Sequence, residues 1–186
     1  MSTTISVLQR VLMIDVETTG FDPSRNTCVE IGAVMLDESL SLTQEFTSLI
    51  APTEGAEIVE LAMRINRIDQ AQLIGAPRSE DVVERFHKIF RLDESVPLLA
   101  GWNVWFDASF LRELYRQARR VWPFAHRLID VQSIISFHCS LEGFSQDEAI
   151  GRFLGERQVH RALADARHTA RLFQFFASRY SIPASL

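Results

Sequence analysis

Residues 10–20 read RVLMIDVETTG, an apolar run that ends in two acids and a Thr-Thr-Gly turn. Residues 10–17 are rich in Val, Leu, Ile and Met and alternate little between apolar and polar, which predicts a buried strand. Asp15 and Glu17 stand two positions apart at the end of that strand. Because side chains alternate across a strand, both carboxylates project to the same face. The stretch therefore predicts a buried strand with a pair of acids at its carboxyl end.

Two further strands are predicted directly after this one. They cover residues 28–36 and 43–51, and turn-like clusters at residues 20–24 and 37–39 separate the three strands. Such short connections favour a three-stranded antiparallel meander.

The second half of the chain alternates strands and helices. Apolar side chains recur at helical spacing over residues 79–91, 105–119 and 161–179, and short helices are expected within 132–154. A short buried strand is expected at residues 97–102, and a fifth strand at residues 127–131. This order indicates an α/β fold in which a mixed five-stranded sheet, an antiparallel meander followed by parallel strands, is flanked by helices. We expect a single domain over residues 9–180, with a flexible N-terminus at residues 1–8 and a tail at residues 181–186.

Composition narrows the class of protein. The chain has 186 residues, of which 47% are hydrophobic and 23% charged, as expected of a soluble globular domain. No apolar run is long enough to cross a bilayer and no signal peptide is recognisable, so we expect a cytoplasmic protein without a membrane partner. Cys28 and Cys139 form no Cys-x-x-Cys pair, which argues against zinc-ribbon and redox motifs and favours two reduced thiols.

The net charge of −5 is unevenly distributed. Residues 1–60 carry ten acids against two arginines, a charge of −8, and the remaining residues carry +3. The basic excess in the later part suits a phosphate backbone and equally an ordinary solvated surface.

Acidic residues recur in two later segments, each where a strand ends or a helix begins. Asp107 ends the segment Asn103-Val104-Trp105-Phe106-Asp107, and Asp165 ends the segment His160-Arg161-Ala162-Leu163-Ala164-Asp165. Taken alone, each has a simpler interpretation: a helix cap for Asp107, a surface acid for Asp165 and a partly buried polar side chain for His160. Together with Asp15 and Glu17, the two acids offer enough oxygens for two divalent cations, and His160 is a candidate general base. The joint pattern indicates metal-dependent hydrolysis of a phosphodiester.

In these motifs the sequence resembles the DEDDh 3′–5′ exonucleases, also called the DnaQ-like family, which include polymerase proofreading subunits, RNase T and oligoribonuclease. The matching stretches are residues 15–23 with 29–34, residues 103–111 and residues 160–166, so the resemblance spans about residues 9–177. The histidine five residues before the last acid is typical of this group and distinguishes it from the tyrosine-bearing branch.

The resemblance implies a ribonuclease H-like fold and a site with two divalent cations, Mg²⁺ or Mn²⁺. Asp15, Glu17, Asp107 and Asp165 would hold the cations, with Asp15 bridging both, and His160 would deprotonate the attacking water. Glu17 would also touch the terminal 3′-hydroxyl, which enforces action at an end.

The resemblance further implies contacts to the 3′ end of a single-stranded nucleic acid. Thr18 and Thr19 would offer N–H or hydroxyl groups to the last nucleotide, and Phe21 and Phe106 would stack on or wedge against bases. The expected substrate-binding residues are Thr18, Thr19, Gly20, Phe21, Asn103 and Phe106. Trp102 and Asn66 stand where many relatives carry histidine, which bears on substrate choice more than on catalysis.

Three functions remain open from the sequence. The leading one is an exonuclease that removes 3′-terminal nucleotides from single-stranded DNA or RNA and releases nucleoside 5′-monophosphates. The second is an exonuclease-fold binding module recruited to a polymerase or replication partner, and the third is an oligoribonuclease-like enzyme for short oligonucleotides. Relatives act either with a polymerase or as homodimers, and the sequence does not choose between these partners.

Overall fold

The computed structural model describes residues 9–140 and 143–179. The expected flexible N-terminus, the tail and the last residue of the expected domain lie outside this part. Five strands form one mixed sheet in the order β3-β2-β1-β4-β5. They are β1 (Val11–Thr18), β2 (Cys28–Leu36), β3 (Leu42–Leu49), β4 (Leu98–Gly101) and β5 (Leu128–Asp130).

The strand pairing confirms the predicted meander followed by parallel strands. β1 pairs antiparallel with β2, and β2 with β3, whereas β4 runs parallel to β1 and β5 parallel to β4. β1 is therefore the central strand, and the carboxyl ends of β1, β4 and β5 lie at one edge of the sheet. In open α/β sheets this edge is where ligands bind.

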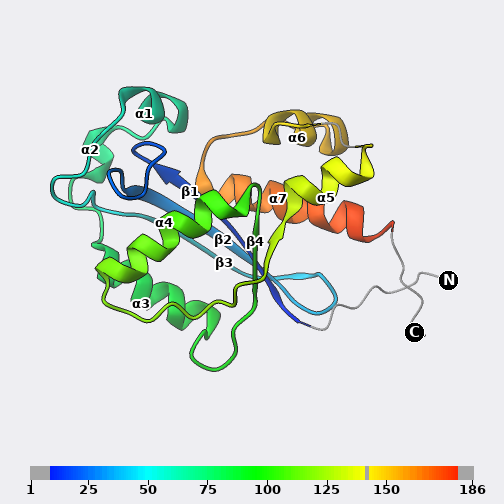
Figure 1. The fold of residues 1–186 in the computed structure, drawn as a ribbon, viewed down its shortest axis with the longest axis horizontal. Coiled ribbons are helices and arrows are strands. Elements are labelled where there is room, and N and C mark those ends of the chain that lie inside the picture. Colours follow the sequence, from blue (N-terminus) through cyan, green and yellow to red (C-terminus); the bar gives the residue numbers. More distant parts are fainter. Residues whose placement is uncertain (1–8, 141–142, 180–186) are drawn as a thin grey trace.

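Helices cover both faces of the sheet (Figure 1). In the described residues they are α1 (Glu60–Asn66), α2 (Gln70–Leu73), α3 (Ser79–Phe90), α4 (Val104–Gln117), α5 (Val131–His138), α6 (Gln146–Leu154) and α7 (Ala162–Ala177). Leu12 and Ile14 of β1 belong to the core shared with α3 and α4, whereas Val11 and Met13 belong to the core shared with α5, α6 and α7. β1 is thus buried on both faces, as its near-continuous apolar run predicts.

Most of the predicted helices are confirmed. The helix expected at 79–91 is α3, that at 105–119 is α4, and that at 161–179 is α7, while α5 and α6 are the short helices expected within 132–154. None of the helices in the described ranges is long and apolar enough to span a lipid bilayer.

The sequence analysis did not predict α1 and α2. The reason lies in their burial, because Leu61 and Ile65 of α1 are exposed and only Ala62 and Asn66 of that helix are buried. A four-residue helix such as α2 has no apolar period to detect, and only its Asp69–Gln72 capping box marks it.

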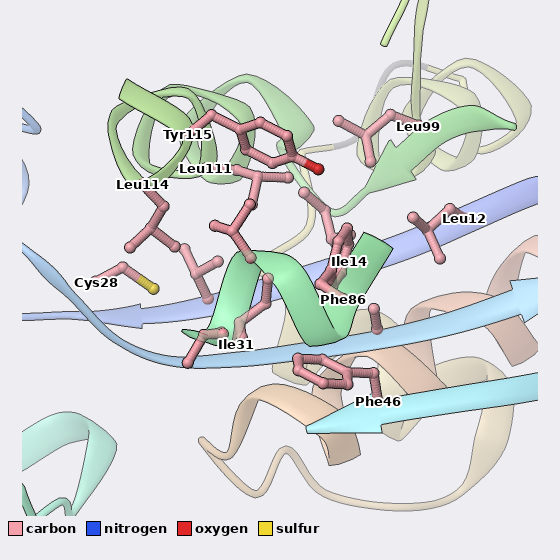
Figure 2. Packing of buried hydrophobic residues seen from close by; sticks show 14 of the residues in the cluster. Leu12, Ile14, Cys28, Ile31, Phe46, Phe86, Leu99, Leu111, Leu114 and Tyr115 are labelled. Carbon is pink, nitrogen blue, oxygen red and sulfur yellow. The ribbon is translucent and has the colours of Figure 1, made fainter. Parts of the chain in front are cut away.

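The core beneath α3 and α4 positions the start of α4. Figure 2 shows Ile14, Ile31 and Phe46 from three adjacent strands packing under Phe86 of α3 and Leu111 of α4. The Phe46 and Phe86 rings meet edge to face, with centroids 5.5 Å apart. Because α4 is held along its length, the acid in its first turn is held against the end of β1.

On the opposite face, α7 packs very closely on β2. A Cβ atom at Gly32 would clash with the backbone of Ala162 and Leu163 in the first turn of α7. Glycine is therefore required at this position, and it lets the amino end of α7 rest directly on the sheet.

Candidate active site

Acids from three elements meet at the carboxyl end of β1. Asp15 and Glu17 lie in β1, Asp107 lies in the first turn of α4, and Asp165 lies in the first turn of α7. One carboxylate oxygen from each of Asp15, Glu17 and Asp165 lies within 4.8 Å of the other two. The fold thus gathers residues that are far apart in the sequence.

Asp107 stands beside this trio rather than within it. Its Oδ1 accepts a hydrogen bond from the backbone nitrogen of Val16 at 3.0 Å, and its side chain is buried. The charge of Asp107 helps to raise the pKa of Asp15, which makes the two carboxyls near neighbours. α4 is thereby anchored to the strand that carries Asp15 and Glu17.

Asp15, Glu17 and Asp107 are held where ionisation is unfavourable. Burial raises the pKa of Asp15 well above its usual range, and the charges of Asp107, Glu17 and Asp165 raise it further. Burial likewise raises the pKa of Asp107. Burial first and neighbouring carboxylates second raise the pKa of Glu17 to about 8. Like charges packed in this way call for a cation between them, and carboxylate oxygens are the ligands that Mg²⁺ and Mn²⁺ prefer. The residues present therefore fit a divalent metal site.

We expect a divalent cation to stabilise the folded chain, and to do so more strongly at pH 8.5 than at pH 5.5. The pKa of Glu17 rises from 4.5 to about 8 on folding. Its contribution to stability is therefore present below pH 4.5 and is lost as the pH rises through 8. A cation bound between the acids removes that loss. At about 100 times its dissociation constant, mass action adds about 2.7 kcal/mol. In a chain of this size that corresponds to a rise in melting temperature of roughly 5–10 °C.

Thermal melts with Mg²⁺, with Mn²⁺ and with EDTA at the two pH values measure this effect. The matched control is Glu17→Gln, which removes one of the repelling charges and so flattens the pH dependence of the metal-free protein. Equal cation effects at both pH values in the wild type, unchanged in Glu17→Gln, would contradict the metal site.

The segment before α7 wraps around the Asp165 carboxylate. Oδ2 accepts hydrogen bonds from the backbone nitrogen of His160 at 3.2 Å and from Nε2 of Gln158 at 3.0 Å. Oδ1 accepts from the backbone nitrogen of Val159 at 3.3 Å. The spacing of five between the histidine and the acid therefore has a structural cause, because the acid binds the backbone of the segment that carries the histidine.

His160 has a left-handed backbone conformation, with φ of 57°. This conformation is uncommon for residues other than glycine, although histidine, asparagine and aspartate adopt it more often than most. The side chain of His160 is partly buried. Among the described residues no partner hydrogen-bonds to its ring, so both ring nitrogens remain available to a substrate or a water.

His168 is a residue of this site that the sequence analysis did not select. It lies one turn after Asp165 in α7, and its Nδ1 lies 3.6 Å from Asp165 Oδ1. Its Nε2 lies 3.1 Å from Glu156 Oε2. The buried His168 thus links Asp165 to the end of α6, and only the i, i+3 spacing in α7 hinted at this contact.

The turn after β1 is held together by its threonines. Thr18 Oγ1 donates to the carbonyl oxygen of Gly20 at 2.6 Å, and Thr19 Oγ1 donates to the carbonyl oxygen of Glu57 at 2.7 Å. Thr18 and Thr19, expected to contact the last nucleotide, are both buried and shape the turn in this structure. Gly20 permits the close approach of the Asn26 side chain, which a Cβ atom would block.

Aromatic rings stand next to the acids. Phe21 follows the turn and is 71% exposed, and its ring centroid lies 6.4 Å from that of Phe106 in the first turn of α4. Asn103 is exposed immediately before α4, and Trp105 beside it is 62% exposed. The expected base-contacting residues Phe21 and Phe106 therefore form a pair, and exposed Trp105 is an additional aromatic that the sequence analysis did not include.

The two positions that depart from many relatives have structural partners. Trp102 packs against the core beneath α7. Asn66 is buried, donates from Nδ2 to the carbonyl oxygen of Thr18 at 3.3 Å and accepts from the backbone nitrogen of Ile68 at 3.0 Å. Asn66 therefore joins the end of α1 to the end of β1.

Comparison with known families identifies the chain. The family model described as Exonuclease, RNase_T, matches residues 12–173. The chain belongs to this exonuclease family. Three curated relatives agree with that assignment: the PolC-type DNA polymerase III of Thermotoga petrophila (30% identical over 166 residues), the DNA polymerase III subunit epsilon of Aquifex aeolicus (29% over 163) and the ribonuclease T of Wigglesworthia glossinidia brevipalpis (26% over 190).

These alignments cover 89%, 87% and 91% of the chain, and 12%, 77% and 85% of the respective relatives. The chain thus spans only a small part of the PolC-type polymerase. Among solved structures, the nuclease domain of 3′hExo, a DEDDh family member bound to rAMP, superposes with a TM-score of 0.73 at 19% identity, covering 89% of this chain and 90% of that one. The predicted membership of the exonuclease family that includes DNA polymerase III proteins and ribonuclease T is confirmed. The superposition confirms the predicted ribonuclease H-like fold.

Proposed function

We propose that this chain is a metal-dependent 3′–5′ exonuclease. It hydrolyses the last phosphodiester bond at the 3′ end of a single-stranded nucleic acid and releases a nucleoside 5′-monophosphate. The observation that carries the proposal is the convergence of Asp15, Glu17 and Asp165, with Asp107 beside them, in a chain of the exonuclease family.

DEDDh exonucleases use divalent metal ions, and in this chain we assign Asp15, Glu17, Asp107 and Asp165 to hold two of them, Mg²⁺ or Mn²⁺. When bound, such ions lower the pKa of water and stabilise the negative charge that grows on phosphate oxygens. Asp15 is the acid best placed to serve both ions, because the charges of the other three all act on it.

His160 is the proposed general base. The backbone nitrogen of His160 donates a hydrogen bond to the Asp165 carboxylate, so the side chain of His160 leaves the backbone at the edge of the acid cluster. A ring nitrogen of His160 takes the proton from the attacking water, a step that typically contributes about 10²–10⁴-fold to the rate. Glu17 contacts the terminal 3′-hydroxyl, which restricts the reaction to chain ends.

The aromatic pair receives the terminal bases. The ring centroids of Phe21, after the turn that ends β1, and of Phe106, in the first turn of α4, lie 6.4 Å apart, and stacking on aromatic rings tolerates any base. The turn formed by Thr18, Thr19 and Gly20 supports Phe21, and the exposed Asn103 offers its amide at the start of α4. This arrangement suits a flexible single strand, whose bases are free to leave a stack.

We expect cleavage to require a free 3′ end. An oligonucleotide that carries a 5′ fluorophore should shorten one nucleotide at a time in Mg²⁺ or Mn²⁺, since the site accepts a terminal nucleotide. A 3′ block should stop the reaction and a 5′ block should leave it unchanged. Product ladders on denaturing gels measure this, with Asp15→Asn as the control against a contaminating nuclease. Degradation that continues when the 3′ end is blocked would overturn the assignment.

The kinds of protein found among the relatives suggest which substrates and partners to test. They include DNA polymerase III proteins and a ribonuclease, so single-stranded DNA and RNA are both candidate substrates. Rates on single-stranded DNA, duplex DNA, RNA and dinucleotides distinguish a proofreading or trimming enzyme from an oligoribonuclease-like one. Mixing with a polymerase III catalytic subunit and measuring mass in solution distinguish a polymerase partner from a homodimer. Partner binding without any cleavage would instead favour the exonuclease-fold binding module.

A further inference from the structure

A partly buried ion pair lies next to the proposed general base. Glu30 in β2 is only 3% exposed and stands opposite Glu17 in the β1–β2 register. Its carboxylate accepts hydrogen bonds from Arg161 Nε at 3.0 Å and from Arg161 Nη2 at 2.6 Å, one on each oxygen. It also accepts from the backbone nitrogen of Ala162 at 3.1 Å. A two-pronged contact of this kind is strong and fixes orientation.

The ion pair fixes the backbone on one side of His160. Arg161 follows His160 directly, and Ala162 is the first residue of α7. On the other side, Asp165 binds the backbone nitrogens of Val159 and His160 itself. His160 is thus held between two carboxylates while its backbone adopts a left-handed conformation.

A second ion pair offers a matched reference. Arg167, in the second turn of α7, binds Glu45 of β3, so it too joins this helix to the sheet. The exposed fractions of the Arg161 and Arg167 side chains are 43% and 48%. The two pairs differ in the burial of the glutamate, since the side chain of Glu30 is 4% exposed and that of Glu45 is 27% exposed. They also differ in what lies next to them, because Arg167 is nearly two turns further along α7 and has no contact with the His160 segment among the described residues.

We propose that Glu30 and Arg161 are positioning residues, whose ion pair sets the orientation of the His160 ring relative to the acid cluster. The inference rests on the proposed nuclease function and deepens it. Arg161 acts through His160 rather than on the substrate. Loss of the pair therefore lowers kcat and leaves KM nearly unchanged, whereas loss of an arginine that bound substrate phosphate would raise KM.

The test is a double-mutant cycle with Arg161→Ala and His160→Asn. Asparagine suits the left-handed conformation, so His160→Asn removes the ring with little backbone strain. Arg161→Ala should lower kcat by roughly 10–100-fold, the size expected of a misplaced catalytic group. In a chain that already carries His160→Asn, Arg161→Ala should cause no further loss of kcat, because a positioning residue has no effect once its target is absent. Arg167→Ala should change kcat by less than about twofold, as is usual for a surface pair.

The proposal would be overturned if Arg161→Ala lowered kcat by the same factor with and without the His160 ring. It would also be overturned if Arg161→Ala and Arg167→Ala lowered kcat equally. Glu30→Gln and Arg161→Lys serve if Arg161→Ala does not fold. Arg161→Lys keeps the charge but not the paired geometry, and an intermediate kcat is expected from it. A second readout is the NMR signal of the His160 ring, assigned by its absence in His160→Asn. The chemical shift of that signal should change in Arg161→Ala and remain the same in Arg167→Ala, even if the wild-type chain cleaves no substrate. Failure of the nuclease function and failure of this proposal therefore give different results.

Discussion

Cleavage at the 3′ end is expected to fall by at least about 10³-fold when Asp15 is replaced by asparagine. Asp15 is partly buried beside three other carboxyls, and asparagine keeps its size while removing the charge that attracts a cation. Metal ions contribute several kcal/mol of transition-state stabilisation. Each 1.4 kcal/mol is about a factor of ten in rate. Single-turnover cleavage of a 5′-labelled oligonucleotide measures the loss of rate. Melting temperatures measured across a Mn²⁺ titration should show weaker cation binding.

The matched control for this change is Asp81→Asn. Asp81 is an exposed acid in the first turn of α3, so the same change of charge and size occurs away from the acid cluster. Its activity should equal that of the wild type. Without a cation, Asp15→Asn should melt at or above the wild-type temperature, because it relieves repulsion between buried charges. A variant that keeps cleavage within tenfold of the wild type would remove Asp15 from the proposed site.

His160→Asn is expected to lower kcat by about 10²–10⁴-fold, the usual contribution of a general base. In contrast to Asp15→Asn, it should keep the rise in melting temperature caused by Mg²⁺ or Mn²⁺. The reason is that Asp165 binds the backbone nitrogen at position 160, which the substitution retains. Pre-steady-state kinetics and melting curves on the same preparation separate the loss of chemistry from the loss of metal.

His126→Asn provides the comparison for that substitution, since His126 is exposed before β5 and remote in sequence from the motifs. It should leave kcat unchanged. If His160→Asn also abolished the cation effect on melting, His160 would belong to the metal site rather than to proton transfer.

The strands and long helices were predictable because they carry their own signal. β1 is apolar on both faces and ends in Asp15 and Glu17, and a central strand covered by helices requires that composition. α7 repeats apolar residues at helical spacing against the sheet. α1 escaped prediction because its apolar residues Leu61 and Ile65 face outward, so its hydrophobic period does not mark a buried face.

The convergence of Asp15, Glu17 and Asp165 was predicted from the sequence, whereas the contacts around these acids were not. The sequence alone placed Asp15 and Glu17 on one face, since side chains alternate along a strand. It did not show that Asp107 is bonded to the Val16 backbone beside the trio, nor that the hydroxyls of Thr18 and Thr19 hold the turn. Those contacts depend on how α4 and the segment before α1 pack against β1.

The amino-acid sequence by itself determined the strands and the long helices of this protein and the residue types of its motifs, because strand alternation, helical spacing and residue type act over short distances along the chain. Only the tertiary structure decided which charges face one another. Glu30 and Arg161 are far apart in sequence and meet because α7 rests on β2 at Gly32. Such pairs leave no periodic trace in a single sequence, since they are set by the packing of whole elements.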